Sequence, residues 1–424
     1  MRTLDQTHER DQAESKRISD RVDIAVQRLR AATTDKQWIE HLRGSLRRAT
    51  GDLRRFERRY HLMVIEPPWS TSPVAVDANA VFFSGESTVH GAVDAACGLI
   101  GMDRPIVHGV DDPTQTRWNL LRRSAVAVFD FTGYNRSAAD PPGELPRSSE
   151  KRAAVIRAAA PIARVAYECG WAFVLGPPMV TLTRPEQGLP FDIDIEPVPL
   201  QRDSDDPMRI ALALQAAVLG VQREPGTEDL TPTVDRLRQL YGNDSTSAPM
   251  LASFENSHDG MHVQLGAAAL LERDPQHRAM LTLPAFPPHY PRADRTPTLF
   301  HVTAFRPWSK PCEESVRDAC TRAGLEYRIG YEHLDPDILR AIWQDIAGAS
   351  FVVADLTNLN PNAALELAIA QALGRPTLVL SQTPDVPVHL PALAKVRVHS
   401  YTGTASGRKE LSQLVQQVAG AAHS

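Results

Sequence analysis

Residues 343–380 read WQDIAGASFVVADLTNLNPNAALELAIAQALGRPTLVL, and the pattern of this stretch occurs a second time upstream. The earlier copy lies in WNLLRRSAVAVFDFTGYN (118–135) and VAYECGWAFVLGPPMVTL (165–182). Both copies contain a Trp, then an apolar run that ends in the string D-x-T-x-x-N, then a Glu followed by Gly and Pro. The chain therefore contains two copies of one α/β unit.

The two copies agree in spacing except at one place. The matched pairs are Trp118 and Trp343, Asp130 and Asp355, Thr132 and Thr357, Asn135 and Asn360, Glu168 and Glu366, Gly176 and Gly374, and Pro178 and Pro376. The distance from Asp to Glu is 38 residues in the first copy and 11 in the second. We attribute the difference to an insertion near 136–162, which could form a lid. The two Trp residues, at equal spacing on helices, are predicted to be core residues.

Composition narrows the classes of protein. The 424 residues have an ordinary apolar share of 42% and a net charge of −5, so we expect two or three domains, no nucleic-acid partner and no membrane partner. The charged N-terminus resembles no signal peptide, and the location expected is cytoplasmic. Four widely spaced cysteines give neither a disulfide framework nor a zinc site. His90, His301 and His389 show no ligand spacing, so neither a metal nor a cofactor is expected.

We predict an α/β fold with two flavodoxin-like parallel-sheet domains in tandem, preceded by an α-helical N-terminal segment. Short apolar runs alternate with helical patterns in both halves, which indicates parallel strands covered by helices on both faces. The predicted boundaries are 1–60 for the helical segment, 61–221 for the first α/β domain, 222–297 for a helical and Pro-rich linker, and 298–424 for the second α/β domain.

Polar residues follow the predicted strand FVVAD. A ligand of a parallel sheet binds beyond the carboxyl ends of the strands, so Asp355 would point into that crevice, with Thr357 beside it. Asn360 suits an N-cap and Pro361 the first helical position, and the helix N-terminus then offers N–H groups to a phosphate or a sugar. Alternatively, Asp355 and Asp130 cap their own turns, because Asp-x-Thr is a common local hydrogen-bonding string.

Each copy also places a Glu on a helix that is otherwise apolar. Glu366 lies four residues after Asn362, so both share one face of the first helical turns. Glu168 has Tyr167 before it, which could hydrogen-bond a substrate, and Gly170 after it, which permits close approach of a ring. A buried carboxylate is costly unless it is paired or functional.

One carboxylate with an Asp nearby suits cleavage of an N-glycosidic bond. The transition state of that reaction resembles an oxocarbenium ion, which a Glu can stabilise or attack. The Asp could bind ribose hydroxyls or assist departure of the base.

The stretch 354–380 resembles the nucleoside 2-deoxyribosyltransferase-like group, a relative of bacterial TIR-like domains. Those families commonly show A-D-L-T at a strand end, then N-P-N, Y-E-L-G and A-x-G-K-P. The resemblance covers most of the second predicted domain and, through the repeat, the first more loosely. It implies catalytic roles for Glu366 and Asp355 in the second copy, and for Glu168 and Asp130 in the first.

Both copies depart from the family pattern. The second has Leu365 in place of the Tyr and Ala368 in place of the Gly. The first keeps Tyr167 and Gly170 but lacks N-P-N after Asn135. The complete Y-E-x-G slightly favours the first copy for chemistry. Activity in only one copy and a single site drawn from both remain alternatives.

The loops after the first strand of each copy supply further candidate ligand contacts. These are Ser84 and Gly85 in the first copy, and Arg306 and Trp308 in the second. Arg306 could bind a phosphate and Trp308 could stack on a base. Arg306 fits a plain surface charge equally well.

These residues support an enzyme that hydrolyses or transfers at the N-glycosidic bond of a nucleoside, nucleotide or NAD-like molecule, expected as a homo-oligomer. A non-catalytic nucleotide sensor with degenerate TIR-like domains is the alternative. A scaffold that assembles through the N-terminal helices is a third hypothesis.

Overall fold

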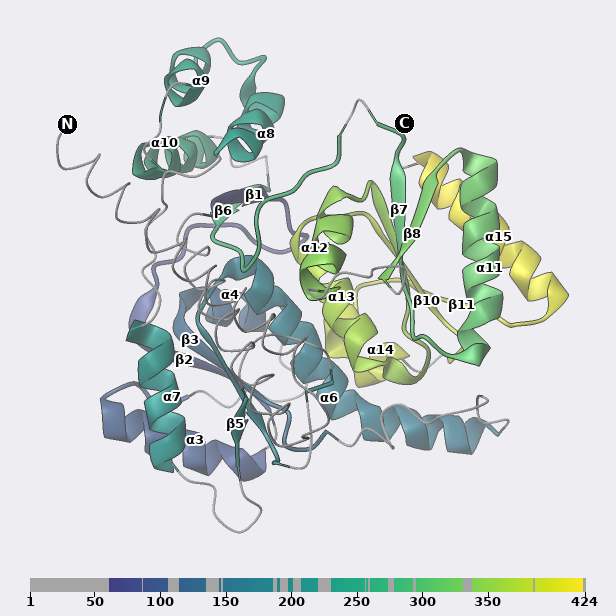
Figure 1. The fold of residues 1–424 in the computed structure, drawn as a ribbon, viewed down its shortest axis with the longest axis horizontal. Coiled ribbons are helices and arrows are strands. Elements are labelled where there is room, and N and C mark those ends of the chain that lie inside the picture. Colours follow the sequence, from purple (N-terminus) through teal and green to yellow (C-terminus); the bar gives the residue numbers. More distant parts are fainter. Residues whose placement is uncertain are drawn as a thin grey trace, which may run out of the picture.

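The computed structural model shows a mixed α/β protein with two parallel sheets (Figure 1). The residues that the structure describes are 61–85, 87–105, 114–134, 145, 148–185, 189–190, 197–200, 207–219, 230–255, 257, 260–273, 278–292, 295–330, 338–383 and 386–421. The helical segment predicted at 1–60 lies outside them. Within these ranges, no helix is long and apolar enough to cross a membrane.

The first sheet has four described strands, all parallel and in chain order: β2 (Asp77–Ser84), β3 (Ser124–Asp130), β4 (Met179–Thr183) and β5 (Val198–Pro199). Helices α3 (Ser87–Ile100) and α7 (Pro207–Leu219) pack on one face, and α4 (Thr114–Arg123) and α6 (Ser149–Leu175) on the other. Since helices cover both faces, every residue of β3 is buried, which explains its unbroken apolar run.

The second sheet is also parallel, in the order β11-β10-β9-β7-β8. Its strands are β7 (Thr298–Val302), β8 (Glu326–Ile329), β9 (Phe351–Asp355), β10 (Thr377–Ser381) and β11 (Val398–Ser400). Helices α11 (Lys310–Ala323) and α15 (Ala405–Ala421) cover one face, and α12 (Ile338–Gly348) and α13 (Pro361–Ala372) cover the other. A short helix, α14 (Val386–His389), follows β10.

The insertion in the first copy lengthens a helix. Helix α6 has 27 residues, whereas its counterpart α13 has 12, and the additional turns lie at the N-terminal end of α6. Before this helix, the insertion predicted as a possible lid lies outside the described residues except for 145 and 148.

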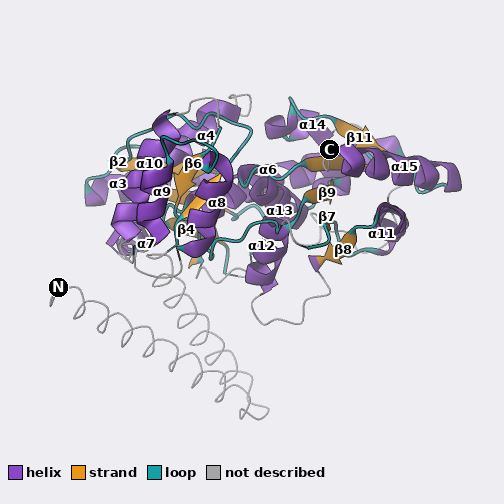
Figure 2. Cartoon of the chain, turned by 90° about the horizontal axis from the view of Figure 1, so that it is seen from above, coloured by secondary structure: helices purple, strands orange, loops and turns teal. Residues whose placement is uncertain are grey.

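Helices α6 and α13 pack against each other between the two sheets and join the units into one apolar core (Figure 2). A Cβ atom on Gly170 would lie 2.5 Å from the carbonyl oxygen of Leu365 and 2.8 Å from the Cβ of Ala368. Gly170 and Ala368 hold matching places, two residues after Glu168 and Glu366. The two copies therefore meet about an approximate two-fold axis.

A two-stranded ribbon shows the same symmetry. Strand β1 (Met63–Ile65), before the first copy, pairs antiparallel with β6 (Met280–Thr282), before the second, and Val64 lies opposite Leu281. Helices α8 (Thr231–Tyr241), α9 (Ala248–Glu255) and α10 (Gly260–Arg273) cover the ribbon with a core of their own. Residues 61–65 were predicted in the first α/β domain and 280–282 in the linker, but the two segments belong together in a middle unit.

The segments after β1 and β6 make equivalent contacts and cross between the copies. We call 66–72 the first arm and 283–289 the second arm. Each arm begins in contact with the copy that it does not precede. A Cβ on Gly374, in the second copy, would lie 2.2 Å from the carbonyl oxygen of Glu66, where the first arm begins. A Cβ on Gly176, in the first copy, would lie 1.7 Å from the carbonyl oxygen of Leu283, where the second arm begins. Both glycines have positive φ, 75° and 80°, which suits the C-terminal end of a helix.

Each arm then ends at its own copy. The indole Nε1 of Trp118 donates to the carbonyl oxygen of Ser70 at 3.2 Å, and that of Trp343 to the carbonyl oxygen of Pro287 at 2.9 Å. Both indoles are fully buried, so the prediction of core Trp residues is confirmed.

Candidate functional site

The two matched aspartates lie at the carboxyl ends of β3 and β9, where the repeat predicted them. Asp130 and Asp355 are 2% and 1% exposed. The Oδ1 atom of Asp130 accepts hydrogen bonds from Thr132, and that of Asp355 from Thr357, in each case from both backbone N–H and hydroxyl. The alternative that each Asp caps its own turn therefore holds for one carboxylate oxygen.

In the first unit, the loop after β2 lies against Asp130. A Cβ on Gly85 would lie 2.3 Å from the Cβ of Asp130, so only glycine fits at this approach. Ser84 is buried at the end of β2. Asn135, the third predicted member of this edge, lies outside the described residues.

Glu168 is bound by an arginine that the sequence analysis did not select. Arg117 on α4 donates from Nε and Nη2 to the two carboxylate oxygens of Glu168, and both side chains are largely buried. The guanidinium also lies over the ring of Phe82, 5.2 Å from its centre. This bidentate geometry neutralises Glu168 and fixes its orientation. Arg117 directly precedes the repeated Trp118, and this position beside a repeated residue is the sequence feature that could have identified it.

Tyr167 and Gly170 lie between helices. The hydroxyl of Tyr167 donates to the side-chain oxygen of Gln371 on α13, and Tyr167 is 1% exposed. Gly170 packs on the backbone of Leu365, as described above. The structure thus gives these two residues of the Y-E-x-G pattern contacts within the protein interior.

In the second unit, Asp355 is part of a buried network. Its Oδ2 accepts a hydrogen bond from the hydroxyl of Tyr401, which follows β11. That hydroxyl also accepts a hydrogen bond from the side-chain nitrogen of Gln382 at 3.0 Å, and the backbone N–H of Gln382 donates to Thr357 at 2.9 Å. Burial raises the pKa of Asp355, and the hydrogen bonds from Thr357 and Tyr401 oppose that rise. The network orients the carboxylate of Asp355.

Sequence reasoning missed Tyr401 and Gln382. Each directly follows a strand of the same sheet, β11 and β10. Asp355 was selected as a polar residue at the carboxyl end of a predicted strand. The same criterion, applied to the strands that precede them, also identifies Tyr401 and Gln382.

The turn between β9 and α13 adopts an unusual backbone. Asn358 and Leu359 have φ values of 63° and 52°, in the left-handed region that costs a bulky residue energy. Leu359 is fully buried in the core shared with α6, which offsets that cost. The Oδ1 of Asn360 then accepts hydrogen bonds from the N–H groups of Asn362 and Ala363, so the N-cap prediction is confirmed.

Glu366 differs from Glu168 because no described residue pairs with it. The residue that corresponds to Arg117, at the offset that relates the two Trp residues, is Ile342. Glu366 is half-buried, and burial alone raises the pKa of its carboxyl to about 8. The group is therefore mostly protonated at neutral pH.

Several buried oxygens near this edge of the second sheet also lack a hydrogen-bond partner among the described residues. They are Oγ1 of Thr303, Oδ1 of Asn358 and Oδ1 of Asn362. Thr303 follows β7, which pairs with β9, and Asn362 shares a helix face with Glu366. Unpaired buried oxygens are costly, so a ligand that donates hydrogen bonds would stabilise this edge.

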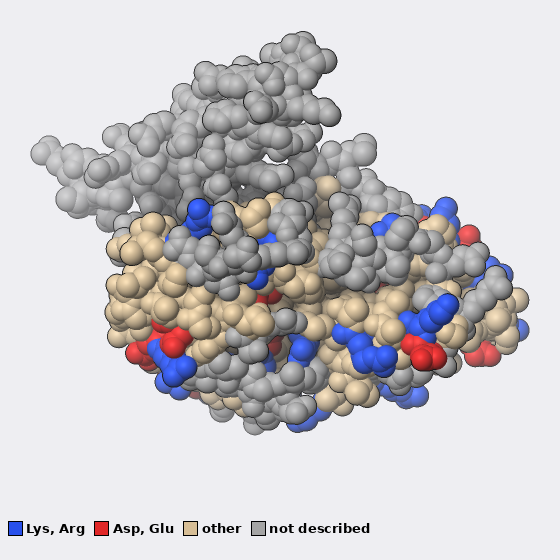
Figure 3. Space-filling model, turned by 90° about the horizontal axis from the view of Figure 1, so that it is seen from below, with Lys and Arg blue, Asp and Glu red and all other residues tan. Residues whose placement is uncertain are grey.

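Trp308 borders the same region, since its carbonyl oxygen accepts a hydrogen bond from Gln382 at 3.5 Å. Arg306 is half-buried at the start of the short 3-10 helix Pro307–Ser309. Figure 3 shows Lys and Arg as well as Asp and Glu side chains scattered over the described surface, so the side of the molecule drawn there carries both charges.

Within the described ranges, no group of three or more His, Cys, Asp or Glu side chains has a geometry that could hold a metal ion. All four cysteines are buried and none is in a disulfide.

No protein-family model matches the chain, and no curated protein and no solved structure is significantly similar to it.

Proposed function

We propose that the protein cleaves or transfers at the N-glycosidic bond of a nucleoside, nucleotide or NAD-like molecule, with Glu366 as the acting carboxyl. The observation that carries the proposal is the state of Glu366, a carboxyl without a partner among the described residues and with a pKa raised to about 8. Numbered by their order in the chain, the strands of the second sheet lie in the order 2-1-3-4-5. This order supports the flavodoxin-like assignment and a ligand beyond the carboxyl end of β9.

The protonation state of Glu366 favours a general acid over a nucleophile. The protonated carboxyl donates its proton to a nitrogen of the leaving base, while the electron pair of the C1′–N bond goes to the base. Water then adds to the oxocarbenium carbon, and the proton that this water loses returns to Glu366. In transfer, a second base takes the place of water.

Base release measured by chromatography tests the proposal. The full chain is incubated with nucleosides, nucleotides and NAD, beside Glu366→Gln and Glu168→Gln. We expect Glu366→Gln to lower the rate by about 100-fold or more, the usual contribution of a positioned acid. Release that is unchanged in Glu366→Gln would overturn the role of Glu366.

A non-catalytic nucleotide sensor is the second candidate, and the first unit favours it. Glu168 is neutralised by Arg117, and Tyr167 is held by Gln371, so neither is available for chemistry. A sensor would show a nucleotide-dependent rise in Tm with no base released from any compound of the panel.

A further inference from the structure

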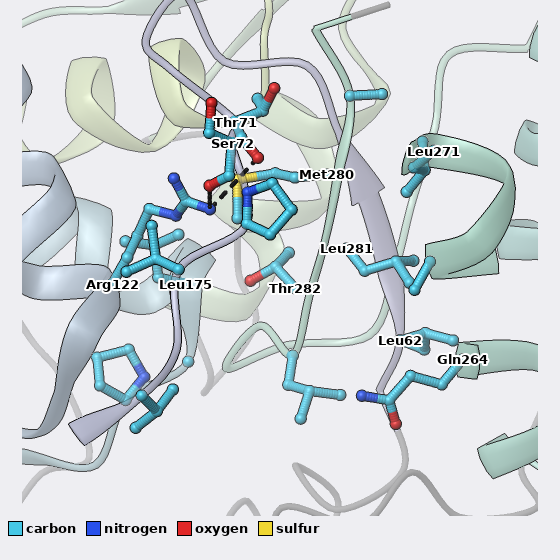
Figure 4. Close-up of a pocket in the computed structure, with 18 of the residues that line it drawn as sticks. Leu62, Thr71, Ser72, Arg122, Leu175, Gln264, Leu271, Met280, Leu281 and Thr282 are labelled. Atoms are coloured by element: carbon cyan, nitrogen blue, oxygen red, sulfur yellow. Dashed lines mark hydrogen bonds between the residues drawn. The ribbon is translucent and has the colours of Figure 1, made fainter. Parts of the chain in front are cut away.

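A cavity of about 550 Å³ lies between the ribbon of β1 and β6, the C-terminal end of α6 and helix α10 (Figure 4). Ser124, at the start of β3, lines it, whereas Asp130 ends that strand, so the cavity is remote from the carboxyl edge of the sheet. Its volume and its place between units are typical of small-molecule sites.

The cavity walls combine apolar and polar side chains, and the described residues that line it include one cation. The apolar surface comes from five leucines and a methionine: Leu62, Leu121, Leu175, Leu271, Leu281 and Met280. The cation is Arg122, whose guanidinium donates to the carbonyl oxygens of Ser70 at 3.0 Å and Ser72 at 2.8 Å.

Among the described residues, no carboxylate forms an ion pair with Arg122. Its described partners are neutral carbonyl oxygens, and burial lowers the pKa of its guanidinium. The lining also contains the acidic residue Glu272, which is exposed on α10. Figure 4 shows Leu271, of the same helix, across the cavity from Arg122. A negative group beside Arg122 would therefore be favoured.

The approximate two-fold axis shows that the cavity is not required by the fold. The residue equivalent to Arg122 in the second copy is Ala347, which is fully buried. On that side, half-buried Arg375 follows Gly374, and the hydroxyl of Tyr290 accepts a hydrogen bond from the N–H of Val64. These two larger side chains hold the sequence positions that Pro177 and Pro73, both of which line the cavity, hold in the first copy.

We propose that this cavity binds a small apolar carboxylate, with its hydrocarbon part against the leucines and its carboxylate on Arg122. The site is separate from the carboxyl edge where Glu366 lies, and it does not depend on the function proposed there.

Calorimetric titration of the full chain with decanoate and with decanamide tests the charge of the ligand. We expect decanoate to bind one site at least about tenfold more tightly than its neutral amide, since hydrogen bonds between charged groups are the stronger ones. Arg122→Met should remove that preference. Arg123→Met, a change at the next and exposed residue of the same helix, should retain it. Equal binding of acid and amide would overturn the proposal.

A second pair of variants locates the site without removing Arg122. Ala268 lines the cavity from α10, and Leu265 is exposed on the same helix. Ala268→Trp should weaken decanoate binding at least about tenfold by occupying the cavity, whereas Leu265→Trp should leave it unchanged. Decanoate binding that persists in Ala268→Trp would place the ligand elsewhere and contradict the proposal.

Discussion

The guanidinium of Arg117 binds the carboxylate of Glu168 in a bidentate pair that is largely shielded from solvent. The second copy has Ile342 at the position of Arg117, so two matched glutamates occupy opposite electrostatic environments. This difference separates the two copies of the repeat more clearly than their sequence motifs do.

Arg117→Ile should destabilise the protein, because it leaves the carboxylate of Glu168 buried without a partner. We expect the free energy of unfolding to fall by about 3 kcal/mol, as when one member of a buried ion pair is removed. Urea denaturation measures the change. Arg123→Ile, at an exposed position of the same helix, should change it by less than about 0.5 kcal/mol. A similar effect from both variants would show that the ion pair is not the cause.

Glu366 should make stability depend on pH. Its pKa rises from an ordinary 4.5 to about 8 on folding. Between these values the unfolded chain loses the proton that the folded protein keeps, so the free energy of unfolding falls as pH rises from about 4.5 to about 8 and is constant above. Glu366→Gln removes this dependence, and it should be more stable than the wild type at about pH 9 by a few kcal/mol. Parallel profiles of urea midpoint against pH would contradict the raised pKa.

Gly170→Ala should push α6 and α13 apart. The new methyl group would lie 2.5 Å from the carbonyl oxygen of Leu365, and we expect a loss of about 1–3 kcal/mol in the free energy of unfolding. Gly98→Ala is the matched control, since a Cβ at this exposed position of α3 has no neighbour within 4 Å. It should stabilise the helix by about 0.5–1 kcal/mol. Thermal unfolding of both variants checks the opposite signs.

Tyr401→Phe should weaken the network around Asp355. The lost hydroxyl donates to Asp355 and accepts from Gln382, so its removal takes one hydrogen bond from the buried carboxylate and one from the half-buried amide. We expect a cost of about 1–3 kcal/mol in the free energy of unfolding. A double-mutant cycle with Asp355→Asn isolates the interaction, and additive effects would show that the two side chains do not cooperate.

The repeat predicted what depends on local pattern. Alternating apolar runs and helices indicated two parallel sheets, and the spacing located buried Trp118 and Trp343, Asp130 at its strand end, and Asn360 at its helix cap. Each of these features is determined within one short stretch of chain.

Contacts between distant segments were not predictable from spacing. The pairing of β1 with β6 joins segments more than 200 residues apart, and a run of three strand residues gives little signal. The interface role of Tyr167 depends on Gln371 in the other copy. Tertiary contact, and not local pattern, decides these positions.

Because the two arms cross between the copies, the chain resembles a domain-swapped dimer whose two subunits are joined in one polypeptide. Each α/β unit completes the C-terminal end of its central helix with backbone that belongs to the other. A cut between 221 and 229 would divide the chain into two fragments, each carrying one arm that its partner requires. Such fragments should be unstable alone and should recover the fold together, and that result would make the pair of units the smallest folding unit of this protein.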